Sequence, residues 1–376
     1  MRILFVFFAS PFGGAEKSLL TLSKILKNEN IDVTYLFTKK CYLSEKIREY
    51  GNVKYMPQKI QKYFLSKKDI KSIKQLIDKM SVKILSMLGL LEKNYLKALK
   101  KYQMNDKFDK AICFFQNKAI MQFTINCVKS TSKAMVLHNS IHQDESMFNN
   151  EFFDIAKQFD KILCVSNSCK DELLEYRADL KGKVDVLKNP TDGEEIKRLS
   201  DEFNIEYDRD VVNIISVSRL AKEKGIIRSL KVMKKLHDEG YNFCWHICGD
   251  GNERSEIEYF IKDNNMEEYI KLYGFKKNPY PYIKAADAFY LGSYQEAAPM
   301  VYGEAILLNV PILSTNTTSA YEMVNKNGYV CENNEEAIYE MFKRCLNRDV
   351  LKKIKKQMKC IKINNKEIIN KICEKW

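Results

Sequence analysis

Short apolar segments alternate with segments of helical periodicity along almost the whole chain, and this alternation restricts the fold more than any other feature. We expect buried β-strands at residues 3–8, 33–37, 53–56, 111–115, 134–138, 162–165, 184–187, 211–217, 243–248, 270–273, 288–291 and 311–314. Helical patterns, for example at 16–27, 225–239 and 335–346, lie between them. Strands that alternate with helices form parallel sheets covered by helices. The sequence therefore predicts an α/β protein with two doubly wound, Rossmann-like domains.

The boundary between these domains is predicted in the polar stretch 189–210, which separates the last strand of the first half from the first strand of the second. A chain of 376 residues with 45% hydrophobic residues is long enough for two cores. We expect domains at 1–195 and 208–350, with a C-terminal helix near 355–376 packing back on the first domain. Ligands of such sheets bind at the carboxyl ends of the strands.

Cysteine usage and apolar run lengths indicate the compartment. The 11 cysteines form no C-x-x-C pair and are odd in number, which favours reduced thiols in the cytosol. The segment "FCWHIC" places Cys244, His246 and Cys248 on one face of a strand, and we prefer a buried strand to a metal site there. The apolar run 3–9 is at the short limit for a signal peptide and is interpreted as the first strand. No run reaches the ~18 apolar residues of a spanning helix. We expect a cytoplasmic protein, with a peripheral position at the inner face of the cell membrane as the alternative.

The net charge of +13 is concentrated in two segments. Residues 59–110 hold 14 lysines and 5 acidic residues, and residues 341–376 hold 12 basic and 3 acidic residues. Such segments suit an anionic partner. No nucleic-acid-binding motif is visible, so we expect no nucleic acid and favour an anionic membrane surface through 59–110. A solvated lysine-rich surface explains the same charges equally well.

One helical stripe lies inside the first basic segment. Its apolar residues alternate steps of three and four: Ile70, Ile73, Ile77, Met80, Ile84, Met87 and Leu91. The stripe suits a membrane interface. We prefer a helix packed on the first domain, or a helical hairpin broken at Gly89, because such stripes usually belong to a core. Both interpretations can hold together, with the apolar residues around 85–91 forming a lipid-facing end.

Two glutamates, Glu296 and Glu304, lie in the otherwise apolar stretch 293–311. Pro299 suits the first turn of a helix that extends to about residue 309. The free N–H groups at such a helix start form an anion site, although a glutamate alone can cap it.

Basic residues and glycines follow other predicted strands. Arg219 and Lys224 come after the strand 211–217, and two cations there can neutralise a diphosphate. In "CGDGNE", Gly249 and Gly251 allow a ligand to approach the backbone.

Taken together, these junctions resemble the donor domain of glycosyltransferase family four, the retaining group 1 enzymes of the GT-B fold. The resemblance is close over 211–328, and "GGAEKSL" at 13–19 extends it to the first domain. It implies an acceptor-binding first domain and a nucleotide-sugar-binding second domain. The loop "AAPM" after Glu296 departs from the common "GFG", which puts hexose specificity in doubt, and Asn309 replaces a glycine at the end of the helix.

The resemblance also implies roles for individual residues. Arg219 and Lys224 would hold the diphosphate, Glu296 the donor sugar, and Glu304 the ribose. His138, near the donor sugar, completes the implied catalytic set. Further implied donor contacts are Gly13, Gly14, Gly249, Gly251, Phe275, Lys276, Ala298, Pro299, Met300 and Val301.

The implied reaction moves a hexose or N-acetylhexosamine from a nucleotide diphosphate sugar, by family preference a UDP-sugar, to a glycan or lipid-linked oligosaccharide of an envelope or capsule polysaccharide. No metal or other cofactor is expected, because the D-x-D match at 208–210 lies in the linker and the pair His138 and His142 lacks the glutamate of zinc proteases. The alternatives are a catalytically silent glycosyltransferase-like subunit and another GT-B enzyme such as an epimerase. A dehydrogenase is disfavoured because no G-x-G-x-x-G follows either first strand.

Overall fold

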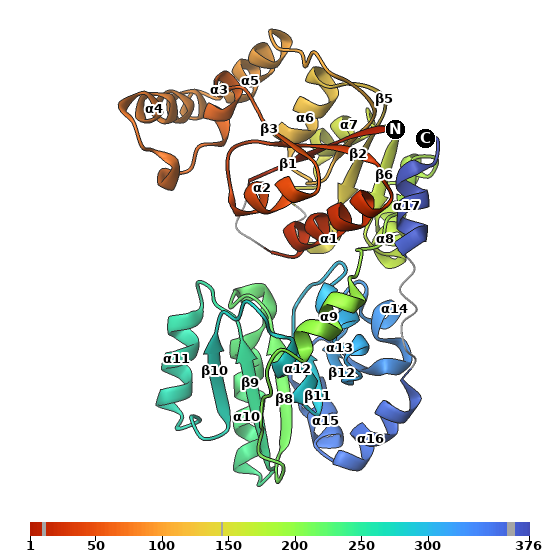
Figure 1. Ribbon diagram of the computed structural model, residues 1–376. Coiled ribbons are helices and arrows are strands. Elements are labelled where there is room, and N and C mark those ends of the chain that lie inside the picture. The colour runs from red at the N-terminus through yellow and green to blue at the C-terminus, as the bar shows by residue number, and fades with distance from the viewer. Residues whose placement is uncertain (10–12, 144–145, 359–364) are drawn as a thin grey trace. The chain divides into compact units, whose positions relative to one another are not determined.

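The computed structural model describes residues 1–9, 13–143, 146–358 and 365–376, and the chain divides into two compact units (Figure 1). The first unit comprises Met1–Val165, Lys170–Pro190 and Asn365–Trp376, and the second comprises Ser166–Cys169 and Thr191–Asn364. The end of the chain, from Asn365, thus belongs to the first unit. Residues 359–364, which are part of the predicted C-terminal helix and of the second basic segment, lie outside the described residues.

The first unit is built on a seven-stranded parallel sheet with the order β3-β2-β1-β4-β5-β6-β7. Its strands are β1 (Arg2–Phe7), β2 (Asp32–Phe37), β3 (Asn52–Tyr55), β4 (Lys107–Cys113), β5 (Lys129–Leu137), β6 (Lys161–Cys164) and β7 (Val184–Val186). Its helices are α1 (Gly14–Asn28), α2 (Tyr42–Lys46), α3 (Gln58–Gln61), α4 (Ile73–Met87), α5 (Leu91–Lys100), α6 (Lys118–Cys127), α7 (Asn150–Ala156), α8 (Asn167–Tyr176, its first turn assigned to the second unit) and α17 (Asn365–Cys373).

The second unit is built on a six-stranded parallel sheet with the order β10-β9-β8-β11-β12-β13. Its strands are β8 (Val212–Val217), β9 (Phe243–Cys248), β10 (Ile270–Gly274), β11 (Ala288–Leu291), β12 (Ile312–Thr315) and β13 (Gly328–Cys331). Its helices are α9 (Gly193–Ser200), α10 (Ile226–Asp238), α11 (Arg254–Asp263), α12 (Tyr280–Ala285), α13 (Met300–Leu307), α14 (Ala320–Val324), α15 (Glu335–Cys345) and α16 (Arg348–Gln357).

All the predicted strands are present, with ends displaced by a few residues, and the prediction of two doubly wound α/β domains is confirmed. Strand β13 is not among the predicted strands. This edge strand has only four residues, three of them half-buried, so it lacks the continuous apolar run that marks a central strand.

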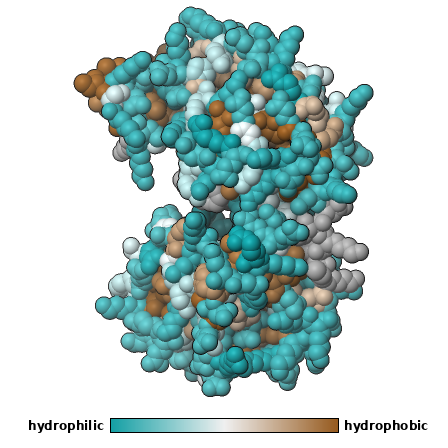
Figure 2. Space-filling model, viewed as in Figure 1, coloured by the Kyte–Doolittle hydropathy of each residue, from teal (hydrophilic) through white to brown (hydrophobic). Residues whose placement is uncertain are grey.

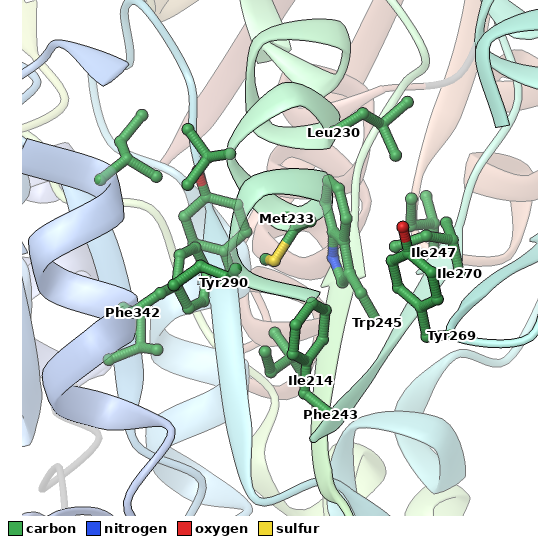
Figure 3. Packing of buried hydrophobic residues seen from close by; sticks show 14 of the residues in the cluster. Ile214, Leu230, Met233, Phe243, Trp245, Ile247, Tyr269, Ile270, Tyr290 and Phe342 are labelled. Atoms are coloured by element: carbon green, nitrogen blue, oxygen red, sulfur yellow. The ribbon is translucent and has the colours of Figure 1, made fainter. Parts of the chain in front are cut away.

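Alternate residues of the second sheet enter two separate cores. Ile214, Trp245 and Tyr290 pack against α10 and α15, as Figure 3 shows for Leu230, Met233 and Phe342. Their strand neighbours, for example Ile215 and Phe289, belong to the second core with α12 and α13. Successive side chains of a strand point to opposite faces, so both faces of this sheet are covered by helices.

Strand β9 is buried at all six positions, which confirms the strand interpretation of "FCWHIC". His246 Nε2 lies 3.0 Å from Asn213 Oδ1, and Nδ1 lies 3.1 Å from the Tyr273 hydroxyl. Within the described parts of the chain, no group of histidine, cysteine or acidic side chains has the arrangement of a metal site. The ten described cysteines are free thiols.

The stability of the second unit should depend on pH through His246. Burial, with a smaller effect of the Lys271 charge, lowers the pKa of His246 to about 4. Unfolded histidine titrates near about 6.5, so between those values the unfolded chain binds a proton that the folded chain does not. Protonation of His246 in the unfolded chain therefore does not affect stability above about pH 6.5. As the pH falls from there toward 4, it lowers the free energy of unfolding by roughly 3 kcal/mol. Urea unfolding at several pH values should show this extra loss in wild type relative to His246→Gln. Parallel pH profiles would contradict it.

The apolar stripe of the first basic segment is divided between two helices, α4 and α5, and Gly89 between them has φ +68°. The predicted break at Gly89 is confirmed. The expectation that packing covers the stripe is wrong for α4: the helix contacts the first unit through Val82, its one buried residue, and the stripe residues of α4 are exposed. No helix in the described ranges is long and apolar enough to cross a membrane.

Candidate functional site

The predicted donor residues of the second unit follow strands that are neighbours in one sheet. Strands β10, β9, β8 and β11 are adjacent and parallel, so the loops after them leave the same edge. Phe275 follows β10, Gly249 follows β9, Arg219 follows β8, and Glu296 follows β11. This carboxyl edge is where doubly wound sheets bind ligands.

Lys224 and Glu296 form the central contact of this edge. Lys224 Nζ lies 2.5 Å from Glu296 Oε1, and the two side chains are only 15% and 11% exposed. The Ser293 hydroxyl donates to the same carboxylate oxygen at 2.7 Å. A partly buried carboxylate is costly without such partners, so the ion pair stabilises Glu296 where water reaches it poorly. A purely structural ion pair would have this geometry as well.

Arg219 does not join that pair. Its guanidinium Nη2 lies 2.8 Å from Glu223 Oε1, and its side chain is 67% exposed. The two predicted diphosphate ligands therefore differ. Lys224 is positioned by a buried partner, whereas Arg219 is exposed and its ion pair with the half-buried Glu223 contributes little stability.

The loops that hold Lys224 and Glu296 are in close contact and are joined by a backbone hydrogen bond. The Tyr294 N–H donates to the Glu223 carbonyl at 2.9 Å. Gly225 has φ +63°, and a Cβ there would lie 2.3 Å from the Gly292 carbonyl oxygen. Arg228 Nη2 donates to this same carbonyl at 2.7 Å. Only glycine allows this close approach, so the position of Glu296 relative to Lys224 depends on Gly225.

Gly249 and Gly251 are explained by packing between neighbouring loops. A Cβ on Gly249 would lie 1.9 Å from the Ser218 carbonyl oxygen, and one on Gly251 would lie 2.2 Å from that of Leu220. The Leu220 N–H also donates to the Asp250 carbonyl at 3.0 Å. The lack of side chains at these glycines therefore supports the loop that carries Arg219, and ligand approach is not needed to explain it.

Helix α13 begins at Met300, immediately after its N-cap residue Pro299, so the helix start expected at this proline is confirmed. No side chain in the described structure caps this end, so the first amides, near Met300 and Val301, have no side-chain acceptor there. Glu304 lies one turn inside the helix and is buried. The helix ends before Asn309, which has a left-handed φ of +58° and so takes the conformation for which glycine is usual at this position.

Two of the implied donor contacts, Phe275 and Lys276, which the resemblance assigns to the nucleotide base, follow the end of β10. Phe275 is exposed, and Lys276 Nζ lies 5.8 Å from the ring centre of Tyr273 and 5.5 Å from that of Tyr282. An exposed aromatic ring is a suitable stacking surface for a flat ligand.

Three predicted residues belong to the first unit. The Gly13 N–H donates to Glu16 Oε2 at 2.9 Å at the start of α1. A Cβ on Gly14 would have no neighbouring atom within 4 Å. His138 follows β5; burial lowers its pKa to about 4, so the ring is neutral at pH 7. Its Nε2 atom is buried and has no hydrogen-bond partner among the described residues. Such an atom is unusual in a folded protein and suits a ligand contact.

The residues that support the Glu296 loop were not predicted from the sequence. Ser293 holds the carboxylate, and its carbonyl accepts from the Thr315 hydroxyl at 2.6 Å. Asn333 Nδ2 donates to the Tyr294 carbonyl at 2.8 Å. These partners come from β12 and from the loop after β13, about 20 and 40 positions along the chain, and no spacing rule links such residues.

Comparison with known proteins agrees with this architecture. The family model described as "Glycosyl transferases group 1" matches residues 198–367. HepE from Anabaena, crystallised with UDP-glucose, aligns with a TM-score of 0.67 at 16% identity and covers 99% of both chains. The fold is therefore GT-B.

Two curated relatives are similar over part of their length. One is the alpha-monoglucosyldiacylglycerol synthase of Acholeplasma laidlawii, 26% identical over 58% of this chain and 55% of that protein. The other is a Campylobacter jejuni N-acetylgalactosaminyltransferase that acts on a diphospho-undecaprenol-linked saccharide, 28% identical over 52% of this chain and 53% of that protein. The chain thus spans about half the length of these relatives. The match to the group 1 glycosyl transferase model thus lies almost entirely in the second unit, where the resemblance placed it.

Proposed function

We propose that this protein is a retaining glycosyltransferase that binds a nucleotide diphosphate sugar at the carboxyl edge of the second sheet. The observation that carries the proposal is the Lys224–Glu296 pair beside the uncapped start of α13. An ammonium has three donors, so Lys224 can keep Glu296 and also meet a phosphate oxygen. Together with the amides of α13 it would stabilise the charge that develops on the departing diphosphate.

The finer assignments follow from the same residues and relatives. Glu296 would accept from hydroxyls of a hexose or N-acetylhexosamine, and Glu304 from the ribose. A uridine nucleotide is supported by the UDP-glucose bound to the Anabaena neighbour. A glycan or lipid-linked acceptor, at the inner face of the cell membrane, is supported by the two curated relatives: one is the synthase of a glycolipid, and the other acts on a diphospho-undecaprenol-linked saccharide. No metal takes part in this proposal.

A donor screen tests the proposal. Thermal shift and calorimetry with UDP, GDP, ADP and their common sugar conjugates should find one nucleotide family that stabilises the wild type. Arg219→Ala should weaken that binding at least about tenfold, because charge-assisted hydrogen bonds to phosphate contribute roughly 1.5–3 kcal/mol.

The matched control is Arg209→Ala. Arg209 is also exposed, but it precedes β8 and so lies at the opposite end of the strand from Arg219. This variant should bind the donor like wild type. If well-folded wild type binds no nucleotide, the enzyme proposal fails and the silent-subunit alternative takes its place.

A further inference from the structure

Helix α4 presents a row of large apolar side chains to solvent. Ile73 is 79% exposed and Met87 is 72% exposed. The complete set, which we call the α4 face, is Ile73, Leu76, Ile77, Met80, Ile84, Met87, Leu88 and Leu90. Figure 2 shows hydrophobic atoms gathered at the part of the surface where Figure 1 places α4. Soluble domains rarely leave such contiguous patches uncovered, so the face indicates an interaction surface.

The exposure follows from how the helix is anchored. With a rotation of about 100° per residue, the seven members from Ile73 to Leu88 fall within an arc of about 120°. Val82, the buried residue of α4, lies about 180° from Ile73 by the same count. Lys79 Nζ also donates to the Leu65 carbonyl at 2.5 Å. The opposite side of α4 therefore attaches the helix to the first unit and turns the apolar arc outward.

Charge identifies the occupant of this face. By the same count of about 100° per residue, Lys83 and Lys74 lie just beyond the two edges of the arc. Both are exposed, and the surrounding segment 59–110 has 14 lysines against 5 acidic residues. A second copy docked on this face would bring lysines of like charge together, which is unfavourable. Lysines that flank an apolar face are instead typical of helices that lie on anionic lipid.

We propose that α4 lies in the headgroup region of an anionic lipid bilayer, with the α4 face toward the acyl chains. A helix of 15 residues is roughly 22 Å long and too short to span the hydrocarbon core of about 30 Å, so it lies in the plane of the interface. The proposal does not depend on the donor site of the second unit, and its test requires no nucleotide.

Vesicle flotation of the full chain at low salt tests the proposal. Wild type should float with vesicles of equal parts phosphatidylcholine and phosphatidylglycerol, and much less with phosphatidylcholine alone. Ile77→Ser with Met80→Ser should weaken partitioning at least about tenfold. Lys74→Gln with Lys83→Gln should weaken it about 30-fold. These side chains are exposed, so circular dichroism and the melting temperature should remain those of wild type.

Matched double variants of the second unit serve as controls. Tyr259→Ser with Tyr321→Ser removes equally exposed apolar groups, and Lys231→Gln with Lys326→Gln removes two exposed charges. Both should float like wild type. Absence of wild type from anionic vesicles, or equal flotation of the α4 variants, would overturn the proposal. If wild type sediments as a dimer and the Ile77→Ser, Met80→Ser variant sediments as a monomer, the α4 face would instead be assigned to a second copy of the chain.

Discussion

Lys224→Met should reduce transfer from the donor at least about 100-fold, because it removes the cation expected to stabilise the departing diphosphate. The same change leaves Glu296, 11% exposed, without its ammonium partner. Breaking a buried ion pair from one side costs roughly 3–5 kcal/mol of stability. Glu296→Gln should likewise lose activity, since a neutral amide replaces the carboxylate proposed to accept hydrogen bonds from the donor sugar. Release of the nucleoside diphosphate gives the activity, and urea unfolding gives the stability.

The double variant Lys224→Met with Glu296→Gln separates function from structure. Replacing both partners by neutral groups removes the unpaired charge, so the free energy of unfolding should return part of the way to the wild-type value. Activity should stay as low as in the single variants. Activity that recovers together with stability would mean that the pair only supports the fold.

Gly225→Ala should be the most damaging substitution that leaves every predicted ligand side chain in place. The left-handed φ of +63° costs about 1–2 kcal/mol for alanine. The new Cβ would lie 2.3 Å from the Gly292 carbonyl oxygen, and relief of such overpacking costs about 1–3 kcal/mol more. Because the Gly292 loop leads to Glu296, donor binding should fall as well. Urea unfolding and nucleotide titration measure the two effects.

Gly240→Ala is the matched control at the other end of α10. Gly240 also has a positive φ, +87°, but no atom lies within 4 Å of the Cβ position. This variant should lose only the conformational part of the stability and should bind donor normally. Equal losses in the two variants would show that the contact between the Gly225 and Gly292 loops does not constrain the site.

Local pattern was sufficient for much of the architecture. Apolar run length and period located the strands up to β12, and the glycine at position 89 marked the helix break that the structure contains. Sheet order then places the strand ends, and with them Arg219, Lys224 and Glu296, at one edge. These properties depend on residues a few positions apart, which is why a single sequence predicts them. The short, half-buried β13 lacked that signal.

Which side chains form ion pairs, and which are exposed to solvent, could be learned only from the tertiary structure. Spacing alone could not show that Lys224 pairs with Glu296, 72 positions away, while Arg219 pairs with Glu223 four positions away. Nor could it show that Gly249 and Gly251 serve packing between loops, or that the apolar arc of α4 faces solvent. Helical period establishes that an apolar face exists, but what covers that face depends on the elements packed around the helix. The Val82 side of α4 rests on the first unit, and the stripe is consequently left outside.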